Sequence, residues 1–194
     1  MAQYDPTTAL IVVDVQHDFA SPDGSLSVAG GEDVVIAANS EIAQALDAGA
    51  PVVYTRDWHP ESTPHFEKDG GVWPVHCVQG TPGAAYHPDL ELVDGAFEVL
   101  KGAGREDGYS GFSERDAGTG ESSATQLDEH LKSIGVTSVV VVGLATDYCV
   151  RATALDAVRL GYSTTVVKKA VAAVDAAAGD NALAEIAEAG GHLE

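Results

Sequence analysis

The sequence contains few basic residues, and this shortage narrows the classes of partner. Only 10 of the 194 residues are Lys or Arg, against 30 Asp and Glu, so the formal net charge is −20. Such a charge repels phosphate backbones and anionic lipid headgroups, so we expect no nucleic acid and no membrane as a partner. A solvated acidic surface is the simpler interpretation, and adaptation to salt is the alternative that composition leaves open.

Long hydrophobic runs and cysteines are also scarce. The first apolar segment has no basic residues before it and is broken by Asp14, so it fits neither a signal peptide nor a membrane span. The two cysteines, Cys77 and Cys149, favour free thiols in a reducing compartment over a structural disulfide. We therefore expect a cytoplasmic protein.

Length and hydrophobic pattern predict one α/β domain over residues 1–194. The chain is long enough for a single well-buried core and has no internal repeat or low-complexity tract. Short β-branched segments alternate with segments rich in Ala, Leu, Glu and Ile, which predicts a mainly parallel sheet between two helical layers, a three-layer α/β/α sandwich. The predicted strands are residues 9–13, 51–55, 97–100, 136–142 and 162–167, and the predicted helices are residues 31–48, 122–134, 147–160 and 181–189.

Polar residues follow four of the predicted strands. Asp14 follows the first, Asp57 and His59 follow the second, Lys101 follows the third, and Cys149 lies beyond the fourth. Ligands of parallel sheets bind beyond the carboxyl ends of the strands. The sequence therefore predicts a functional site at this edge.

The segment of residues 58–96 interrupts the alternation and is rich in Pro and Gly. Loops of this length in a compact domain are usually functional or disordered, and the His, Trp and Asp content of this one opposes disorder. Imidazole and carboxylate ligands suit Zn²⁺, Fe²⁺ or Mn²⁺ and leave open positions for water or substrate. We therefore predict one divalent transition metal, with zinc favoured, on Asp57, His59, His65 and His76.

Cys149 lies at the predicted start of a helix that Thr146 or Asp147 would cap. A helix N-terminus favours the thiolate, which is the reactive form of cysteine. An isolated cysteine is more often a buried core residue. Asp14 and Lys101 favour a functional role for Cys149 over a core role, because charged side chains near a core are costly unless they are paired.

Three segments carry a family resemblance: residues 13–19 (VDVQHDF), residues 101–103 (KGA) followed by 109–112 (YSGF), and residues 143–156 (GLATDYCVRATALD). Together with the metal motif between them, they resemble the nicotinamidase branch of the isochorismatase-like hydrolases. The resemblance spans nearly the whole chain. It implies the isochorismatase-like fold, a metal-binding loop insertion at about residues 57–96, and hydrolysis of nicotinamide to nicotinate and ammonia in NAD salvage, with pyrazinamide as a further substrate.

The resemblance implies a catalytic triad of Asp14, Lys101 and Cys149. Asp14 would accept the thiol proton and later donate it to ammonia, while Lys101 would hold the charged groups in place. The thiolate would attack the amide carbonyl, and water would then hydrolyse the thioester. The backbone N–H groups of Ala145 and Cys149 would form the oxyanion hole, next to a cis peptide between Leu144 and Ala145.

The resemblance also implies how a pyridine carboxamide would be held. The metal would contact the ring nitrogen, directly or through its water, and so orient the amide. Phe19, Trp73 and Tyr109 match aromatic positions that flank the ring in the family, whereas Tyr148 departs from a histidine present in some relatives. Cys77 matches a family cysteine that is structural.

Three alternative functions and one open point remain. Amidohydrolases acting on carbamoyl or ureido compounds share the triad but generally lack the metal motif, and true isochorismatases lack the cysteine. A non-catalytic metal-binding or thiol redox-sensing module could use Cys77 and Cys149. The number of chains is open, so a homo-oligomer is compatible with the sequence.

Overall fold

A six-stranded sheet forms the centre of the computed structural model, which describes residues 3–194. Its strand order is β3-β2-β1-β6-β7-β8, and every neighbouring pair is parallel. The predicted parallel sheet is therefore confirmed. The strands are β1 (Thr8–Val13), β2 (Val52–Asp57), β3 (Phe97–Lys101), β6 (Ser138–Leu144), β7 (Ser163–Ala172) and β8 (His192–Leu193).

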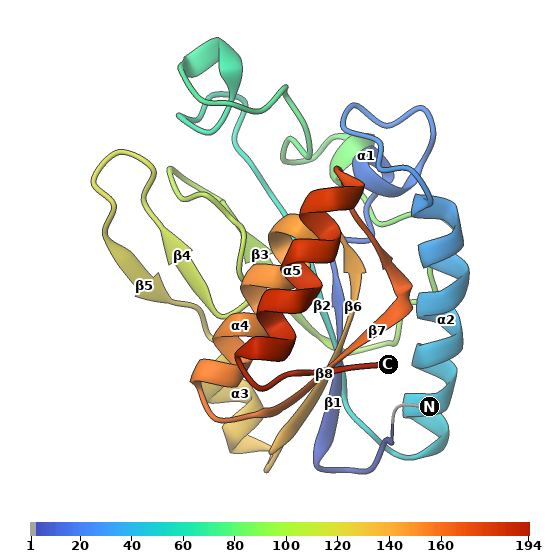
Figure 1. Ribbon diagram of the computed structural model, residues 1–194. Helices are drawn as coiled ribbons and strands as arrows, with labels where there is room; N and C mark the ends of the chain where they lie inside the picture. Colours follow the sequence, from blue (N-terminus) through green and yellow to red (C-terminus); the bar gives the residue numbers. More distant parts are fainter. Residues whose placement is uncertain (1–2) are drawn as a thin grey trace.

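Helices cover both faces of this sheet (Figure 1). Leu10 and Val12 of β1 pack in the core on the α2 side, whereas Ala9, Ile11 and Val13 pack in the core with α3, α4 and α5. Successive residues of a strand point to opposite faces, so β1 is buried on both. This confirms the three-layer sandwich. The helices are α1 (His17–Ala20), α2 (Gly31–Asp47), α3 (Leu127–Ser133), α4 (Arg151–Arg159) and α5 (Ala176–Glu188).

The carboxyl ends of the central strands meet at one edge. Asp57, the last residue of β2, pairs with Lys101, the last residue of β3, and Val13 of β1 pairs with Gly143 of β6. Asp14 follows β1 directly. Parallel pairing thus gathers residues that are far apart in the sequence, as predicted.

Two helix predictions were partly wrong. Residues 122–124, predicted as helix, form the exposed strand β5 (Ser122–Ala124), which pairs antiparallel with β4 (Ser113–Arg115), and α3 begins only after it. Residues 122–124 form a strand because β4 lies beside them as a pairing partner, which local propensity does not reveal. The last helix begins at residue 176 rather than 181, because the Asp175 carboxylate accepts a hydrogen bond from the Ala178 N–H and caps it.

The segment between β2 and β3 is irregular, as predicted. Within it the structure has two single turns of 3₁₀ helix, η1 (Glu67–Asp69) and η2 (Pro82–Ala84). Across residues 3–194, no helix combines the length and apolar character that crossing a bilayer requires.

Candidate active site

The three predicted catalytic residues come together at the sheet edge. The Lys101 Nζ atom lies 2.6 Å from Asp14 Oδ2 and 2.8 Å from Asp57 Oδ1. The carboxylates of Asp14 and Asp57 and the Cys149 sulfur lie within 4.8 Å of one another. Asp14 and Lys101 are fully buried. A buried ammonium between two carboxylates is the pairing that such charges need in a core.

Burial controls the protonation of the pair formed by Asp14 and Cys149. It raises the pKa of Asp14 to about 6, although the Lys101 ammonium opposes the shift. Burial also raises the pKa of the Cys149 thiol well above its usual value, again against the effect of Lys101. At neutral pH the site therefore holds a protonated thiol beside an ionised carboxylate. Burial therefore opposes the thiolate that a helix start would favour.

The turn that carries Cys149 differs from the predicted helix start. It is a π-helical turn, η3 (Thr146–Val150), and no side chain caps it. The Asp147 carboxylate instead accepts hydrogen bonds from the N–H groups of Val174 and Asp175, at 3.0 and 2.9 Å. These bonds tie the turn that carries Cys149 to the segment before α5. The predicted cis peptide between Leu144 and Ala145 is present.

Three predicted metal ligands form a compact buried group. The ligand atoms of His59, His65 and His76 lie within 4.8 Å of one another. Asp57 Oδ2 lies 3.5 Å from His59 Nε2 and 3.8 Å from His76 Nε2. All four predicted ligands are therefore adjacent, and Asp57 lies between the histidine group and Lys101.

The ring orientations suit a metal ion. His59 Nδ1 lies 3.1 Å from the Gly102 carbonyl oxygen, and His76 Nδ1 lies 2.8 Å from the Pro74 carbonyl oxygen. Such backbone contacts fix the tautomer and turn Nε2 toward a ligand. His59 Nε2 is buried and has no hydrogen-bond partner within the described residues. An unsatisfied buried nitrogen facing other ligands fits a bound cation.

Charge favours the histidine group over the triad as the metal site. Burial lowers the pKa of His65 to about 3, so its ring is neutral. Burial would raise the pKa of Asp57, but Lys101, His59 and His76 outweigh it and hold the pKa well below its usual value. A cation among Asp14, Asp57 and Cys149 would meet the Lys101 ammonium, which already occupies that space.

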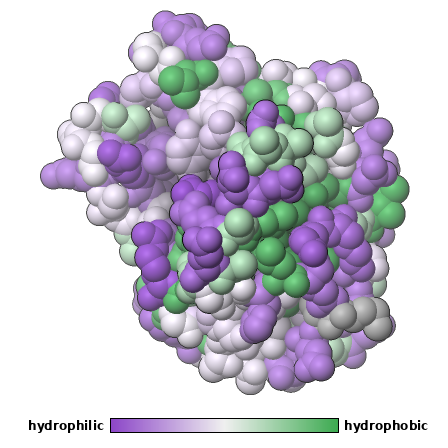
Figure 2. Space-filling view, in the orientation of Figure 1, coloured by the Kyte–Doolittle hydropathy of each residue, from purple (hydrophilic) through white to green (hydrophobic). Residues whose placement is uncertain are grey.

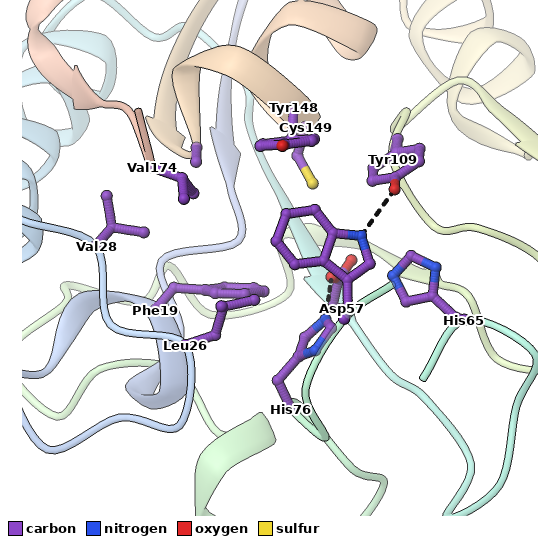
Figure 3. A pocket seen from close by; sticks show the side chains of 12 residues that line it. Phe19, Leu26, Val28, Asp57, His65, His76, Tyr109, Tyr148, Cys149 and Val174 are labelled. Carbon is purple, nitrogen blue, oxygen red and sulfur yellow. Dashed lines mark hydrogen bonds and ion pairs between the residues drawn. The ribbon is translucent and has the colours of Figure 1, made fainter. Parts of the chain in front are cut away.

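A pocket opens onto both groups, and the Cys149 sulfur points into it (Figure 3). The Trp73 Nε1 atom donates a hydrogen bond to the Tyr109 hydroxyl at 2.9 Å, and the Trp73 and Tyr148 rings meet edge to face with centroids 4.7 Å apart. The predicted aromatic residues therefore all line the pocket. The lining residues are Phe19, Leu26, Val28, Asp57, His65, Trp73, His76, Tyr109, Ala145, Tyr148, Cys149 and Val174.

Comparison with known proteins settles the family. Residues 8–194 match the isochorismatase domain family. This chain belongs to the isochorismatase family. A nicotinamidase/pyrazinamidase of Mycobacterium tuberculosis is 44% identical over 172 residues, which cover 87% of this chain and 88% of the relative.

Solved structures of isochorismatase-family relatives have the same fold. A pyrazinamidase of Pyrococcus horikoshii in complex with zinc has a TM-score of 0.88 and 39% identity, over 97% of this chain and 99% of that one. PnC1 from L. infantum in complex with nicotinate also has a TM-score of 0.88 and 39% identity, over 97% of this chain and 92% of that one.

Several supporting residues of this isochorismatase-family site were not predicted. Gln16 is fully buried and binds the Asp57 backbone twice: its Nε2 donates to the Asp57 carbonyl and its Oε1 accepts from the Asp57 N–H, both at 2.8 Å. The Thr55 hydroxyl donates to Asp14 Oδ1 at 2.6 Å. The only sequence signal was their position beside or within the motifs.

Two residues of α4 hold the loop that surrounds Lys101. Asp156 accepts hydrogen bonds from the Ser110 and Ser113 hydroxyls at 2.5 and 2.6 Å, and the Thr153 hydroxyl accepts one from the Gly111 N–H at 3.0 Å. The same loop supplies the Gly108 and Tyr109 carbonyls that accept from Lys101. The pocket residues Leu26, Val28 and Val174 were also missed, since apolar residues in loops carry no distinctive pattern.

Cys77 is buried in the core on the α2 side and is a free thiol, as is Cys149. Burial raises the pKa of the Cys77 thiol well above its usual value. It is not among the grouped metal-ligand atoms of the described residues. This agrees with the structural role predicted for it.

Proposed function

We propose that this protein is a nicotinamidase, which hydrolyses nicotinamide to nicotinate and ammonia and accepts pyrazinamide as well. One observation carries the proposal: the Cys149 thiol, with the buried Asp14 and Lys101 beside it, lines the same aromatic-walled pocket as His65 and His76 of the histidine group. The curated relative at 44% identity and the nicotinate bound to the L. infantum relative support a pyridine carboxamide as substrate.

The triad supplies the proton transfers. Asp14 takes the Cys149 proton as the sulfur attacks the amide carbonyl carbon and forms the C–S bond. Asp14 then returns that proton to the nitrogen, and the C–N bond breaks to release ammonia. Water, deprotonated by Asp14, attacks the thioester; the C–S bond breaks, nicotinate leaves, and the thiol regains its proton. Lys101 holds the Asp14 carboxylate 2.6 Å away and stabilises negative charge in the site.

The backbone N–H groups of Ala145 and Cys149 are proposed as the oxyanion hole. Both residues line the pocket, on the turn between β6 and α4. Fixed backbone donors at the carbonyl oxygen stabilise the tetrahedral intermediate in a site that excludes water.

We propose that Asp57, His59, His65 and His76 hold one divalent transition metal, and the zinc complex of the P. horikoshii relative favours zinc over iron or manganese. When bound, the ion supplies an electrophilic contact for the ring nitrogen of the substrate. Phe19, Trp73 and Tyr109 then enclose the ring so that the carboxamide faces Cys149. The free thiols at Cys77 and Cys149 support the cytoplasm as the compartment, since the nucleophile must stay reduced.

The activity is tested by ammonia release from nicotinamide, pyrazinamide and N-carbamoyl compounds. We expect release from the two pyridine or pyrazine carboxamides, and loss of that activity by at least about a thousandfold in Cys149→Ala, because no other thiol lines the pocket. Circular dichroism and metal content serve as controls and should match the wild type. Release from N-carbamoyl compounds alone would assign the protein to the amidohydrolases of carbamoyl or ureido compounds.

Metal removal is the second test. We expect about one ion per chain by elemental analysis, and chelation should raise the KM for nicotinamide or remove activity until zinc is restored. The alkylation rate of Cys149 by iodoacetamide should stay unchanged, since the thiol reacts with this reagent without the ion. Full activity in metal-free protein would contradict the metal proposal and leave the thiol chemistry standing.

A further inference from the structure

Asp18 connects two separate walls of the pocket, although it belongs to neither the triad nor the histidine group. It lies half-buried in the first turn of α1. Its Oδ1 accepts a hydrogen bond from the Ser25 N–H at 3.1 Å, and its Oδ2 accepts one from the Cys77 N–H at 2.7 Å. One carboxylate therefore holds the backbone of two loops.

The Cys77 peptide is the link to the histidines. Cys77 directly follows His76, and its carbonyl accepts a hydrogen bond from the His59 N–H at 3.0 Å. Its φ of +46° is in the left-handed region, which a cysteine adopts only when its surroundings impose it. The bond from the Cys77 N–H to Asp18 stabilises that conformation and so sets the backbone that carries two of the proposed ligands.

The other bond of Asp18 reaches the apolar wall. Besides the Ser25 contact, the Asp18 carbonyl accepts from the Leu26 N–H at 3.1 Å, and the side chain of Leu26 lines the pocket. Phe19, the next residue after Asp18, lines it too, with its ring centroid 5.4 Å from that of His76. In Figure 3 Phe19 and Leu26 lie beside each other on the opposite side of the pocket from His65.

The carboxylate is closely packed. A Cβ atom added at Gly83 would lie 2.2 Å from Asp18 Oδ2, so a larger residue at position 83 would have to displace this carboxylate.

We propose that Asp18 is a positioning residue that holds the metal-binding loop against the pocket wall of residues 19–28. This inference rests on the proposed nicotinamidase function. Asp18 contacts neither the substrate pocket nor the triad; it acts through Cys77 on His59 and His76, and through Ser25 on Leu26. Its loss should weaken metal retention and ring binding while the triad stays intact.

The experiment compares Asp18→Asn and Asp18→Ala with the matched control Asp23→Ala. The amide of asparagine keeps one acceptor oxygen of the two, and alanine keeps none. Asp23 lies in the same segment but is exposed, and its carboxylate forms an ion pair with His17. Zinc-loaded proteins are measured for zinc release to a chromogenic chelator, for KM and kcat with nicotinamide, and for Cys149 alkylation resolved by peptide mass spectrometry.

We expect the zinc dissociation constant to rise about tenfold or more in Asp18→Ala and less in Asp18→Asn, as for lost outer-shell contacts of metal sites. KM should rise more than kcat falls, and the Cys149 alkylation rate should stay within about twofold. Asp23→Ala should match the wild type. If Asp18→Ala does not fold, the zinc affinity and KM of Asp18→Asn test the proposal.

Wild-type zinc affinity and KM in the Asp18 variants would overturn the inference, as would an equal loss in Asp23→Ala. A wild-type protein that releases no ammonia from nicotinamide would refute the proposed function instead. In that case the zinc measurement still decides the role of Asp18.

Discussion

Lys101 joins the two chemical groups of the site. Its ammonium contacts Asp14 on the side of Cys149 and Asp57 on the side of the histidines. Burial would lower the pKa of Lys101, but the two carboxylates outweigh it and hold the pKa well above its usual value. Lys101 therefore stays charged, and the triad and the metal group share one electrostatic centre.

The pKa of Asp14 predicts the acid limb of the pH profile. Asp14 accepts the thiol proton only when it is ionised, and its pKa is raised to about 6 by burial. Activity should therefore fall as the pH falls through about 6, and at one unit below that pKa kcat/KM should be about a tenth of its plateau. The measurement is kcat/KM for nicotinamide between pH 5 and 8. A profile flat to pH 5 would contradict the role of Asp14.

Thr55→Val is the matched variant for this prediction. The Thr55 hydroxyl donates to Asp14 Oδ1, and a donor to the charged form lowers the pKa of a carboxyl. Valine has the same shape without the donor. The midpoint of the acid limb should therefore move to higher pH in Thr55→Val, with the plateau little changed.

At the scale of elements, β1 and β6 approach each other closely just before the turn η3, which carries Cys149. Gly143 near the end of β6 has a φ of +113°, and a Cβ there would lie 2.0 Å from the Val13 carbonyl oxygen in β1. The backbone then passes through the cis peptide after Leu144 and into η3. No residue with a side chain fits this position without moving one of the two strands.

Gly143→Ala should therefore destabilise the protein by about 3 kcal/mol or more, since strain and a backbone clash add. Gly135→Ala is the control: Gly135 also has a positive φ, of +78°, but a Cβ there meets nothing within 4 Å, so we expect a loss of about 1–2 kcal/mol. Urea denaturation gives both values. Equal losses would contradict the role assigned to strand approach.

At the scale of the whole molecule, the acidic surface sets the response to salt. The formal net charge is −20, and in Figure 2 clusters of hydrophilic side chains surround a hydrophobic area at the centre of the face. Like charges repel one another in the compact state, and salt screens this repulsion. The melting temperature should therefore rise as NaCl increases from about 10 mM to 1 M. Sucrose at matched osmolality is the control, and a melting temperature that falls in NaCl would contradict the prediction.

Some features of the fold and the site could be predicted because they depend on local pattern. Apolar, β-branched runs predicted five of the six strands of the central sheet. The placement of Asp14, Asp57 and Lys101 at the ends of three of these strands located the site. The strand of residues 192–193 and the hairpin of β4 and β5 were missed, because short exposed strands form only where a partner lies beside them.

The sequence by itself determined the α/β class and the site edge and supplied the candidate reactive side chains, because periodicity and residue type are local properties. Tertiary structure decided which form of those side chains exists. Burial raises the pKa of the Cys149 thiol well above its usual value, and Lys101, His59 and His76 hold the pKa of Asp57 well below its usual value. Tertiary structure also decided the bonds of Gln16 to Asp57 and of Asp18 to Cys77, since hydrogen bonds between segments far apart in the chain exist only once the loops are packed together.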